Sequence, residues 1–440
     1  MSIKTFKGGV HPGYFKSLTA NLPVVSMPLP EKVIIPLQQH IGVPCEPLVS
    51  PGDEVKVGQK IGESSGFVSA PIHATISGKV TKIEPYEHPL GRPVQSVFIE
   101  ADGQDSWHEA GGGTQSLADL DAGEIKKIIR EAGIVGLGGA AFPTHVKISP
   151  PADKPIDTVI VNGAECEPYL TADHRVMLER SEDVVFGLKA VMKALDCKKG
   201  YIGIEDNKPD AIEALREACA EEENIEVIPL HTKYPQGAEK MLIEVITGRQ
   251  VPSGGLPMDV GVVNQNAGTC VAIAEAIKEG RPLVERVVTV TGPGIEKPAN
   301  VKVRLGTIVR EVIDYCGGMK EDTRKLILGG PMMGLAQPTA DIPVIKGTSG
   351  ILVLTEREVV VSDIRPCIKC AKCVDVCPVN ILPNFLGLAG EQGLIERSEE
   401  LNALDCIECG CCTYICPAKR PLTQWIRIAK AEITARRNKK

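Results

Sequence analysis

Two cysteine runs near the C-terminus share a spacing that suits metal chemistry. Each run has two residues between successive members of the first three cysteines, and three residues before a fourth cysteine that precedes proline. The runs are Cys367, Cys370, Cys373 and Cys377 before Pro378, and Cys406, Cys409, Cys412 and Cys416 before Pro417. In this spacing three thiolates bind one [4Fe–4S] cluster and the fourth reaches the neighbouring cluster. We therefore expect two [4Fe–4S] clusters and the transfer of single electrons.

The pseudo-symmetry of the runs predicts how the thiolates are shared. Cys416 should complete the cluster of the first run, and Cys377 should complete that of the second. Zinc is the weaker interpretation, because a zinc site would need only CxxC pairs, without a third cysteine or the Cys-Pro ending. Cys411 lies outside the spacing and is expected to be a packed or mobile thiol. The remaining cysteines, expected to be small buried hydrophobes, are Cys45, Cys166, Cys197, Cys219, Cys270 and Cys316.

A glycine-rich loop at 136–144 has a bare backbone that a flat or phosphorylated ligand could approach closely. Its residues Gly136, Gly138 and Ala141 have the G-x-G-x-x-G/A spacing of dinucleotide-binding loops, but such a loop must follow a strand. Here a helix precedes it, because Asp121 and Glu124 form a capping box ahead of apolar residues at helical spacing. The ordinary Rossmann interpretation of this loop therefore fails.

Beyond the loop, strands alternate with helices as in an open α/β sheet. We expect strands at 158–161, 200–204 and 225–230, and helices at 182–195 and 210–222. Ligands bind such sheets at the carboxyl ends of the strands, where Asn162, Glu165 and Glu167 follow the first strand. This amide and these carboxylates suit ribose hydroxyls or a nicotinamide amide, although a solvated acidic turn is the alternative. Residues 234–240 and 263–269 are each expected to open a further helix, whose N-terminus favours anions.

Composition limits the possible partners. The net charge of −7, the pI near 5.8 and the aromatic content of 4% argue against nucleic acid. No stretch approaches the ~18 apolar residues of a membrane span, and residues 1–20 contain no secretory segment, which predicts a cytoplasmic location. Residues 419–440 hold eight Lys or Arg and one acid, which suit lipid headgroups, an acidic subunit or simply a solvated helix end.

The central stretches resemble the NADH-binding flavoprotein subunit of respiratory complex I. They are GLGGAAFPTHVK (136–147), NGAECEP (162–168), GAEK (237–240) and NQNAGT (264–269). The resemblance implies that FMN and NAD(H) bind here. The implied FMN residues are Gly136, Gly138, Gly139, Lys147, Asn162, Glu165, Asn264, Asn266 and Thr269. It also implies that Phe142 and Glu167 meet the nicotinamide nucleotide and that Glu239 lies beside the flavin.

The two ends of the chain resemble the family of C subunits of the Rnf electron-transport complex, through FKGGVHP (6–12) and the two cysteine runs. That family's complex couples electron flow between reduced ferredoxin and NAD⁺ to Na⁺ or H⁺ pumping. The resemblance implies an oxidoreductase subunit without a catalytic side chain, peripheral on the cytoplasmic side of the membrane. The implied partners are integral membrane subunits and a ferredoxin-like subunit. The alternatives are a cobalamin reductase of bacterial microcompartments, in which the flavin domain comes first, and a relay subunit without flavin.

We therefore predict a multidomain protein of α/β and β units. Residues 33–100 form two β-halves with glycine turns that resemble the barrel-sandwich fold of lipoyl domains, but the hairpin at 66–71 lacks the carrier lysine. Residues 287–340 resemble the ubiquitin-like (β-grasp) SLBB domain. The predicted units are an N-terminal arm and barrel-sandwich hybrid (1–116), a Rossmann-like open α/β domain for FMN and NADH (117–285), an SLBB domain (286–350) and a two-cluster ferredoxin-like domain with a basic tail (351–440).

Overall fold

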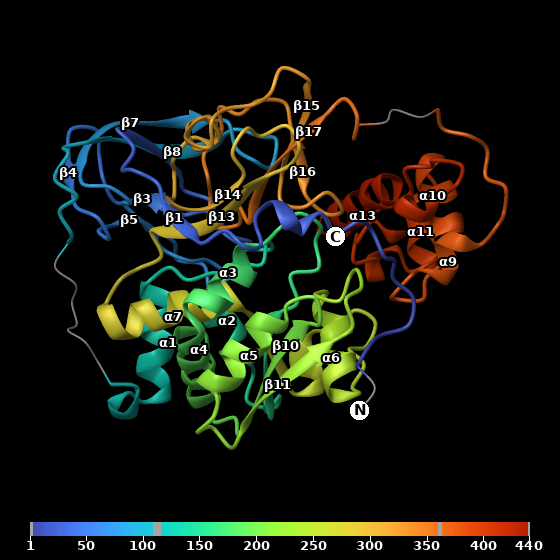
Figure 1. The fold of residues 1–440 in the computed structure, drawn as a ribbon, viewed down its shortest axis with the longest axis horizontal. Helices are drawn as coiled ribbons and strands as arrows, with labels where there is room; N and C mark the ends of the chain where they lie inside the picture. Colours follow the sequence, from blue (N-terminus) through green and yellow to red (C-terminus); the bar gives the residue numbers. More distant parts are fainter. Residues whose placement is uncertain (1–2, 109–115, 360–362, 439–440) are drawn as a thin grey trace.

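The computed structural model describes residues 3–108, 116–359 and 363–438. Figure 1 shows two β-rich units side by side, an α/β unit below them and a helical C-terminal unit to one side. The predicted multidomain α/β and β class is confirmed by this arrangement. Among the described helices, none has the length and apolar character needed to cross a membrane.

The N-terminal β unit consists of two small sheets around one apolar core. The first has the order β2-β8-β7-β4 and the second β3-β5-β6. Val33 and Ile35 alternate inward on β2 and are fully buried against Val97 and Ile99 of β8. The strands are β2 (Lys32–Pro36), β3 (Glu46–Pro47), β4 (Glu54–Val55), β5 (Lys60–Glu63), β6 (Ile72–His73), β7 (Gly78–Tyr86) and β8 (Val94–Ala101).

The α/β domain holds a parallel sheet in the order β11-β10-β9-β12. The three predicted strands are confirmed as β9 (Thr158–Gly163), β10 (Lys199–Glu205) and β11 (Ile225–Leu230). The capping box is confirmed too, since Asp121 and Glu124 exchange side-chain to backbone hydrogen bonds of 2.8 Å. Residues predicted only to open a helix form the fourth strand, β12 (Val262–Asn266), because its apolar start pairs with β9.

Helices flank this sheet. The predicted helix 182–195 is observed as α4 (Ser181–Ala194) and the predicted helix 210–222 as α5 (Pro209–Ala218). The others are α1 (Ala122–Glu131), α2 (Thr144–Lys147), α3 (Ala172–Glu179), α6 (Glu239–Thr247) and α7 (Ala267–Glu279). The apolar faces of α1, α3, α4, α5 and α7 form one core with the sheet, and α6 packs on the sheet in a second apolar cluster that includes Ile160 and Leu230. This packing fixes the strand ends where the candidate ligand residues lie.

The second β unit is a six-stranded sheet in the order β1-β14-β13-β17-β15-β16. Its strands are β1 (Val24–Ser26), β13 (Glu285–Thr291), β14 (Ala299–Arg304), β15 (Thr323–Leu328), β16 (Leu335–Gln337) and β17 (Gly350–Thr355), with α8 (Val309–Tyr315) packed on it. The entirely buried β17 pairs with β13 and β15, so the boundary predicted between residues 350 and 351 falls inside a central strand. The edge strand β1 precedes the N-terminal β unit in sequence and pairs with β14.

The C-terminal unit (363–438), called the cysteine domain below, is helical. It contains α9 (Lys372–Asp375), α10 (Pro383–Glu391), α11 (Ile395–Glu400), α12 (Cys411–Ile415) and α13 (Leu422–Asn438). Much of the predicted basic tail lies on α13, where Arg437 pairs with Glu399 of α11 at 2.6 Å and Lys430 pairs with Glu408 at 2.6 Å. These basic groups are therefore largely neutralised inside the domain.

Candidate functional site

The eight regularly spaced cysteines line two cavities in the cysteine domain. The first cavity is lined by Cys367, Cys370, Cys373 and Cys416. The second is lined by Cys377, Cys406, Cys409 and Cys412. Each cavity thus takes three cysteines from one run and the fourth cysteine from the other.

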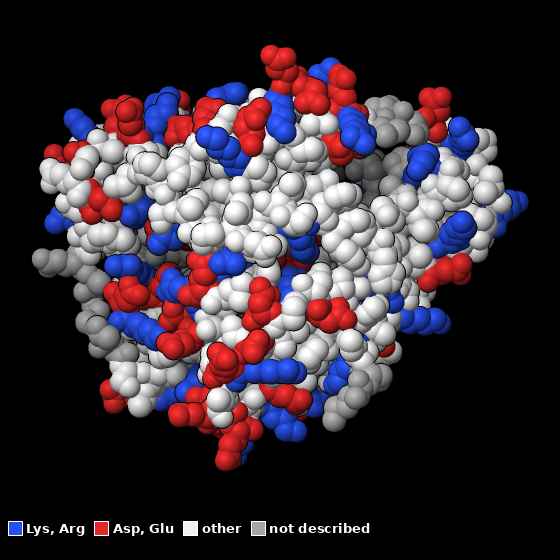
Figure 2. All heavy atoms as spheres, in the orientation of Figure 1, with Lys and Arg blue, Asp and Glu red and all other residues white. Residues whose placement is uncertain are grey.

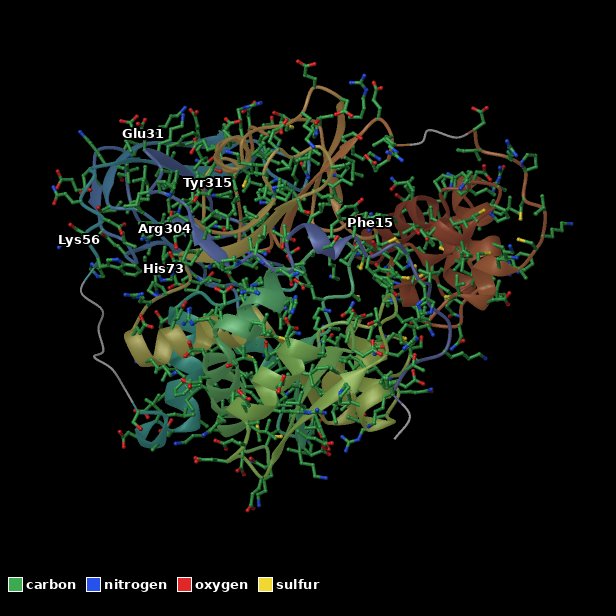
Figure 3. The ribbon with its side chains drawn as sticks, viewed as in Figure 1. Phe15, Glu31, Lys56, His73, Arg304 and Tyr315 are labelled. Atoms are coloured by element: carbon green, nitrogen blue, oxygen red, sulfur yellow. The ribbon has the colours of Figure 1, made fainter. Side chains whose placement is uncertain are left out.

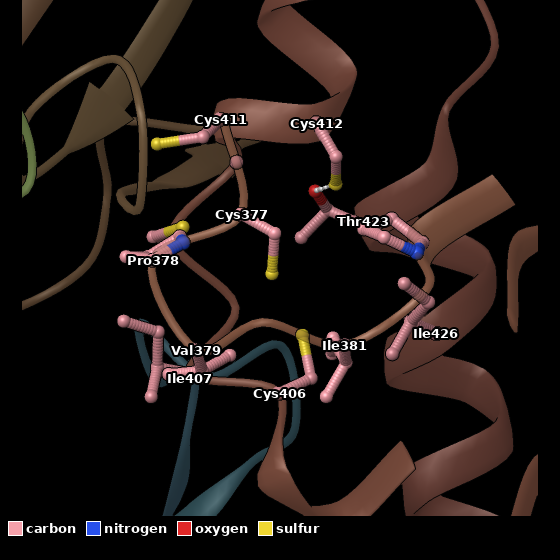
Figure 4. Close-up of a pocket in the computed structure, with 13 residues that line it drawn as sticks. Cys377, Pro378, Val379, Ile381, Cys406, Ile407, Cys411, Cys412, Thr423 and Ile426 are labelled. Carbon is pink, nitrogen blue, oxygen red and sulfur yellow. Dashed lines mark hydrogen bonds between the residues drawn. The ribbon is translucent and has the colours of Figure 1, made fainter. Parts of the chain in front are cut away.

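Figure 4 shows the second cavity. The sulfur atoms of Cys377, Cys406 and Cys412 point into it, whereas the sulfur of Cys411 points away. Cys411 is fully buried and packs with Val10, consistent with the packed thiol that the sequence suggested. The rest of the wall is mostly apolar, including Ile381, Ile407 and Ile426.

The two cysteine runs share their backbone conformation as well as their spacing. Left-handed residues occupy equivalent places: Lys369 (φ 55°) and Glu408 (φ 58°) each stand one residue before the second cysteine. Ala371 (φ 60°) and Gly410 (φ 79°) each follow it and start a short helix that carries the third cysteine. These turns bend the chain around each cavity, so successive thiols face the same space.

Burial disfavours the free thiolates of Cys377, Cys406 and Cys412, whereas hydrogen bonding with Cys411 lowers the pKa of Cys409. Burial raises the pKa of Cys412 to about 12 and that of Cys406 to about 11. Metal coordination deprotonates a thiol outright. Among the described residues, no three His, Cys, Asp or Glu side chains converge closely enough to hold a single metal ion. Four thiols around an apolar cavity, by contrast, fit a multi-iron group.

The second candidate site lies at the carboxyl ends of β9 and β12. Asn162 of β9 stands beside Asn266, the last residue of β12. Asn162 Nδ2 donates to the carbonyl of Gly237 at 2.8 Å, and Asn266 Nδ2 donates to Asp173 at 2.7 Å. The structure therefore brings both predicted amides to one sheet edge, with the start of α6 alongside.

Further predicted residues reach the same edge from α2, α6 and α7. Lys147 Nζ donates to the carbonyl of Asn264 at 3.1 Å and forms an ion pair with Glu239 at 2.9 Å. Thr269 Oγ1 accepts the N–H of Leu137 at 2.9 Å, which ties α7 to the glycine-rich loop. These contacts unite segments that are far apart in the sequence.

The glycine-rich loop presents its backbone here. The N–H of Gly136 donates to the carbonyl of Phe142 at 2.9 Å, so the loop closes on itself. Gly138 and Gly139 remain exposed, and a Cβ at Gly138 would come within 3.5 Å of Asn266 Nδ2. Asn264 Oδ1 is buried without a hydrogen-bond partner among the described residues. An open glycine backbone, a lysine and an unsatisfied buried amide oxygen fit a phosphorylated, hydrogen-bonding cofactor such as FMN.

The acidic residues after β9 serve the structure as well. Glu165 accepts the N–H groups of Asp173 and His174 at 2.7 and 3.2 Å, which caps α3. Burial, reinforced by the charge of Glu165, raises the pKa of Asp173 to about 7.

Glu167 links the sheet edge to the second β unit. Its carboxylate accepts the N–H groups of Met332 at 3.1 Å and Met333 at 2.8 Å, both in the turn between β15 and β16. Burial raises the pKa of Glu167 to about 7. The sequence did not indicate this role, and the nucleotide contact of Glu167 and Phe142 stays a prediction.

Four protein families match the chain in consecutive segments. They are the RnfC barrel sandwich hybrid domain (residues 4–104), the Nuo51 FMN-binding domain (129–275), the SLBB domain (287–336) and the 4Fe-4S dicluster domain (366–420). This is the order of units that the sequence predicted.

Full-length relatives are similar over nearly the whole chain. The C subunit of the "Proton-translocating ferredoxin:NAD(+) oxidoreductase complex" of Clostridium ljungdahlii is 53% identical over 98% of this chain and 94% of its own. The C subunit of the "Na(+)-translocating ferredoxin:NAD(+) oxidoreductase complex" of Acetobacterium woodii is 52% identical over 100% of both chains. The chain belongs to this family of Rnf C subunits. The C subunit of the "Ion-translocating oxidoreductase complex" of Rhodobacter capsulatus is 42% identical over 99% of this chain and 84% of its own.

The fold of this Rnf family member is also shared in part with solved structures of a distant enzyme. The NAD⁺-reducing [NiFe]-hydrogenase in its H₂-reduced state aligns with 72% of this chain and 62% of that chain, with a TM-score of 0.51 and 19% identity. The air-oxidised state aligns equally well. At this identity the likeness concerns the fold alone.

Three residues of this Rnf family member were not predicted as part of a site. The hydroxyl of the fully buried Tyr234 donates to the carbonyl of Cys409 at 2.8 Å, and Cys166 Sγ accepts the N–H of Gly237 at 3.3 Å. Lys16 Nζ donates to the carbonyls of Glu165 and Glu167 at 2.8 and 2.9 Å. Cys166 lies inside the quoted NGAECEP stretch, and Tyr234 begins the 234–240 stretch that was expected to open a helix. Lys16 carries no local signal, since only the tertiary fold brings it there.

Proposed function

We propose that this chain exchanges a hydride between NAD(H) and FMN and relays single electrons through two [4Fe–4S] clusters. It would do so as the NADH-docking subunit of an ion-translocating ferredoxin:NAD⁺ oxidoreductase complex. The observation that carries the proposal is the contact between the two candidate sites, where Tyr234 joins the α/β domain to the Cys409 loop. When bound, FMN supplies the conversion between a two-electron hydride and single electrons.

The chain's own residues would hold the flavin rather than perform acid–base chemistry. Gly136, Gly138 and Gly139 would admit the cofactor to the backbone, and Lys147 would provide positive charge beside it. Asn162, Glu165, Glu239, Asn264, Asn266 and Thr269 would complete the set. Phe142 and Glu167 are proposed to contact the nicotinamide nucleotide.

The burial of the two cysteine groups supports an order of transfer. The group of Cys377, Cys406, Cys409 and Cys412 lies against the α/β domain through Tyr234. In the other group, Cys367 and Cys370 are exposed. We propose that electrons from NADH reach the buried group first and leave through the exposed one.

The surface around the exposed group supports docking of an acidic electron carrier. Ile364 and Ile368 are 54% and 66% exposed, which leaves an apolar patch beside Cys367 and Cys370. Arg365, Lys369, Lys372 and Lys419 are exposed in the same stretches of chain. Figure 2 shows Lys and Arg over the cysteine domain on the drawn face. The ferredoxin-like subunit of the complex is the proposed partner here, with integral membrane subunits holding the assembly on the cytoplasmic side of the membrane.

The division into domains is also a proposal. A division that keeps the six-stranded sheet whole would extend the SLBB unit to Thr355, the end of β17, and start the cysteine domain near residue 363. The other predicted boundaries, after residues 116 and 285, would stand.

Anaerobic titration of the purified chain with NADH tests the proposed function. Bleaching of the flavin absorbance, followed by that of the iron–sulfur absorbance, is expected. Lys147→Met should lower flavin content at least about tenfold, because the charge beside the ligand is lost. Lys154→Met is the matched control, since Lys154 is also an ion-paired lysine, with Asp259, away from the sheet edge. A protein that binds clusters but neither flavin nor NADH would leave only the relay interpretation.

A further inference from the structure

The N-terminal arm, residues 3–16, lies between the α/β domain and the cysteine domain. Figure 1 shows this dark blue segment running from the N-terminus between the two units. Lys4 forms a parallel bridge with Leu230, at the end of β11. Val10 pairs with Tyr234 through two backbone hydrogen bonds of 2.8 and 3.0 Å. One side of the arm is therefore joined to the α/β domain by two isolated β-bridges.

The other side of the arm contacts the chain at a cysteine of the buried group. The N–H of Gly9 donates to the carbonyl of Val376 at 2.9 Å, next to Cys377. A Cβ at Gly8 would lie 3.1 Å from the carbonyl oxygens of Val376 and Cys377, and a Cβ at Gly9 would lie 2.6 Å from that of Tyr234. Both glycines have left-handed φ angles, +82° and +79°. Only glycine combines this backbone with so close an approach on both sides.

The arm then continues to the loop that follows β9. Phe15, labelled in Figure 3, stacks on Tyr169 with a centroid separation of 4.9 Å. Tyr14 accepts the N–H of Tyr169 through its carbonyl at 2.8 Å. Lys16 donates to three carbonyls of this loop, those of Glu165, Glu167 and Leu170. A single segment thus contacts the proposed flavin edge and the buried cysteine group.

We propose that Gly8 and Gly9 are positioning residues that set the separation between the flavin edge and the buried cysteine group. The inference rests on the proposed function. At Gly8 and Gly9 the arm places only backbone between the Tyr234 turn and the Val376–Cys377 turn. A side chain on either glycine must move these turns apart. The flavin edge and the buried cysteine group then move apart too, and the rate of single-electron transfer depends on the distance between them.

The test compares Gly8→Ala and Gly9→Ala with Gly91→Ala in the full-length, cofactor-loaded chain. Gly91 is the matched control, because its φ is +78° and a Cβ there would meet no described atom within 4 Å. After anaerobic mixing with NADH, flavin reduction should keep its rate in all three variants. Bleaching of the iron–sulfur absorbance should slow several-fold in the first two, because a Cβ at Gly8 or Gly9 pushes against the carbonyls of Val376, Cys377 or Tyr234. The control should match the unaltered protein.

Hydrogen exchange of the protein without NADH provides a second readout. The amides of Val10 and Tyr234 should exchange faster in Gly9→Ala and stay unchanged in Gly91→Ala. If Gly9→Ala does not retain iron, Lys233→Met replaces it, since Lys233 Nζ donates to the carbonyl of Phe6 at 2.8 Å and lies 4.6 Å from the Phe6 ring centroid. Cluster bleaching at the control rate, or slowed bleaching without faster exchange, would overturn the inference. Failure of the proposed function is distinct, because the unaltered flavin would then not be reduced at all.

Discussion

The two cysteine groups have the same spacing and the same backbone turns, but they lie in different surroundings. Cys367 and Cys370 are exposed at the surface, whereas Cys377, Cys409 and Cys412 are buried. The buried group is also tied to the α/β domain, because Tyr234 donates its hydroxyl to the carbonyl of Cys409. Spacing therefore determines how each group is built, and the neighbouring domains determine its place in an electron route.

The largest expected effect comes from removing one ligand of each cysteine group in turn, because the two groups should have different roles in electron transfer. Cys409→Ser should remove the cluster of the buried group, lower the iron content by about half and stop electron transfer from the flavin. Cys370→Ser should lower iron equally but leave transfer into the buried group intact. Iron analysis and anaerobic stopped-flow absorbance with NADH measure both quantities. If both variants lost electron transfer from the flavin equally, the proposed order, from the buried group to the exposed group, would be wrong.

A second difference concerns access to the thiols. In metal-free protein, Cys367 and Cys370 should be alkylated at least about tenfold faster than Cys409 and Cys412, because the reagent must reach the sulfur and the latter two are buried. Mass spectrometry after a timed iodoacetamide pulse gives the rates. The fully buried Cys270 serves as the slow reference. Similar rates at all four ligand positions would contradict the contrast in burial.

The junction beside the buried group should depend on pH through Glu167. Burial raises its pKa from 4.5 to about 7, a shift that the amides of Met332 and Met333, Lys16 and the Tyr234 hydroxyl partly oppose. The folded state therefore holds this proton more tightly than the unfolded state, and stability should fall as pH rises from 4.5 to 7.

Glu167→Gln should lose that pH dependence, which is on the order of 2 kcal/mol. Thermal unfolding at pH 5 and pH 8 measures it. Glu226→Gln is the control, since Glu226 is exposed on β11. If the Glu167 variant kept the pH dependence of the unaltered protein, another group would be responsible.

The smallest effect should come from the hydroxyl of Tyr234. Tyr234→Phe removes its hydrogen bond to the carbonyl of Cys409, at a cost of about 1 kcal/mol in stability. Paramagnetic resonance of the reduced protein should show a changed signal for the buried cluster and an unaltered one for the exposed cluster. A change in the exposed cluster's signal would mean that the groups are less independent than their surroundings indicate.

Much of this fold could be predicted from patterns among neighbouring residues. Pairings between segments far apart in the sequence could not. The cysteine spacing, the capping box at Asp121 and the strands around β9 follow from neighbouring residues. By contrast, β1 and β17 join a sheet whose other strands lie far away in sequence, and Val262–Asn266 is a strand only because it pairs with β9. The anchoring of Glu167 and the carbonyl contacts of Lys16 were likewise out of reach, because they depend on how separate units pack.

The sharing of cysteines between the runs is the central claim, and paramagnetic resonance of reduced Cys377→Ser tests it most directly. Cys377 belongs to the first run in sequence but lines the second cavity, together with Cys409. The Cys377 variant should therefore perturb the same signal as Cys409→Ser and leave the signal altered by Cys370→Ser unchanged. If it instead matched Cys370→Ser, each run would hold its own cluster, and the arrangement described here would be wrong.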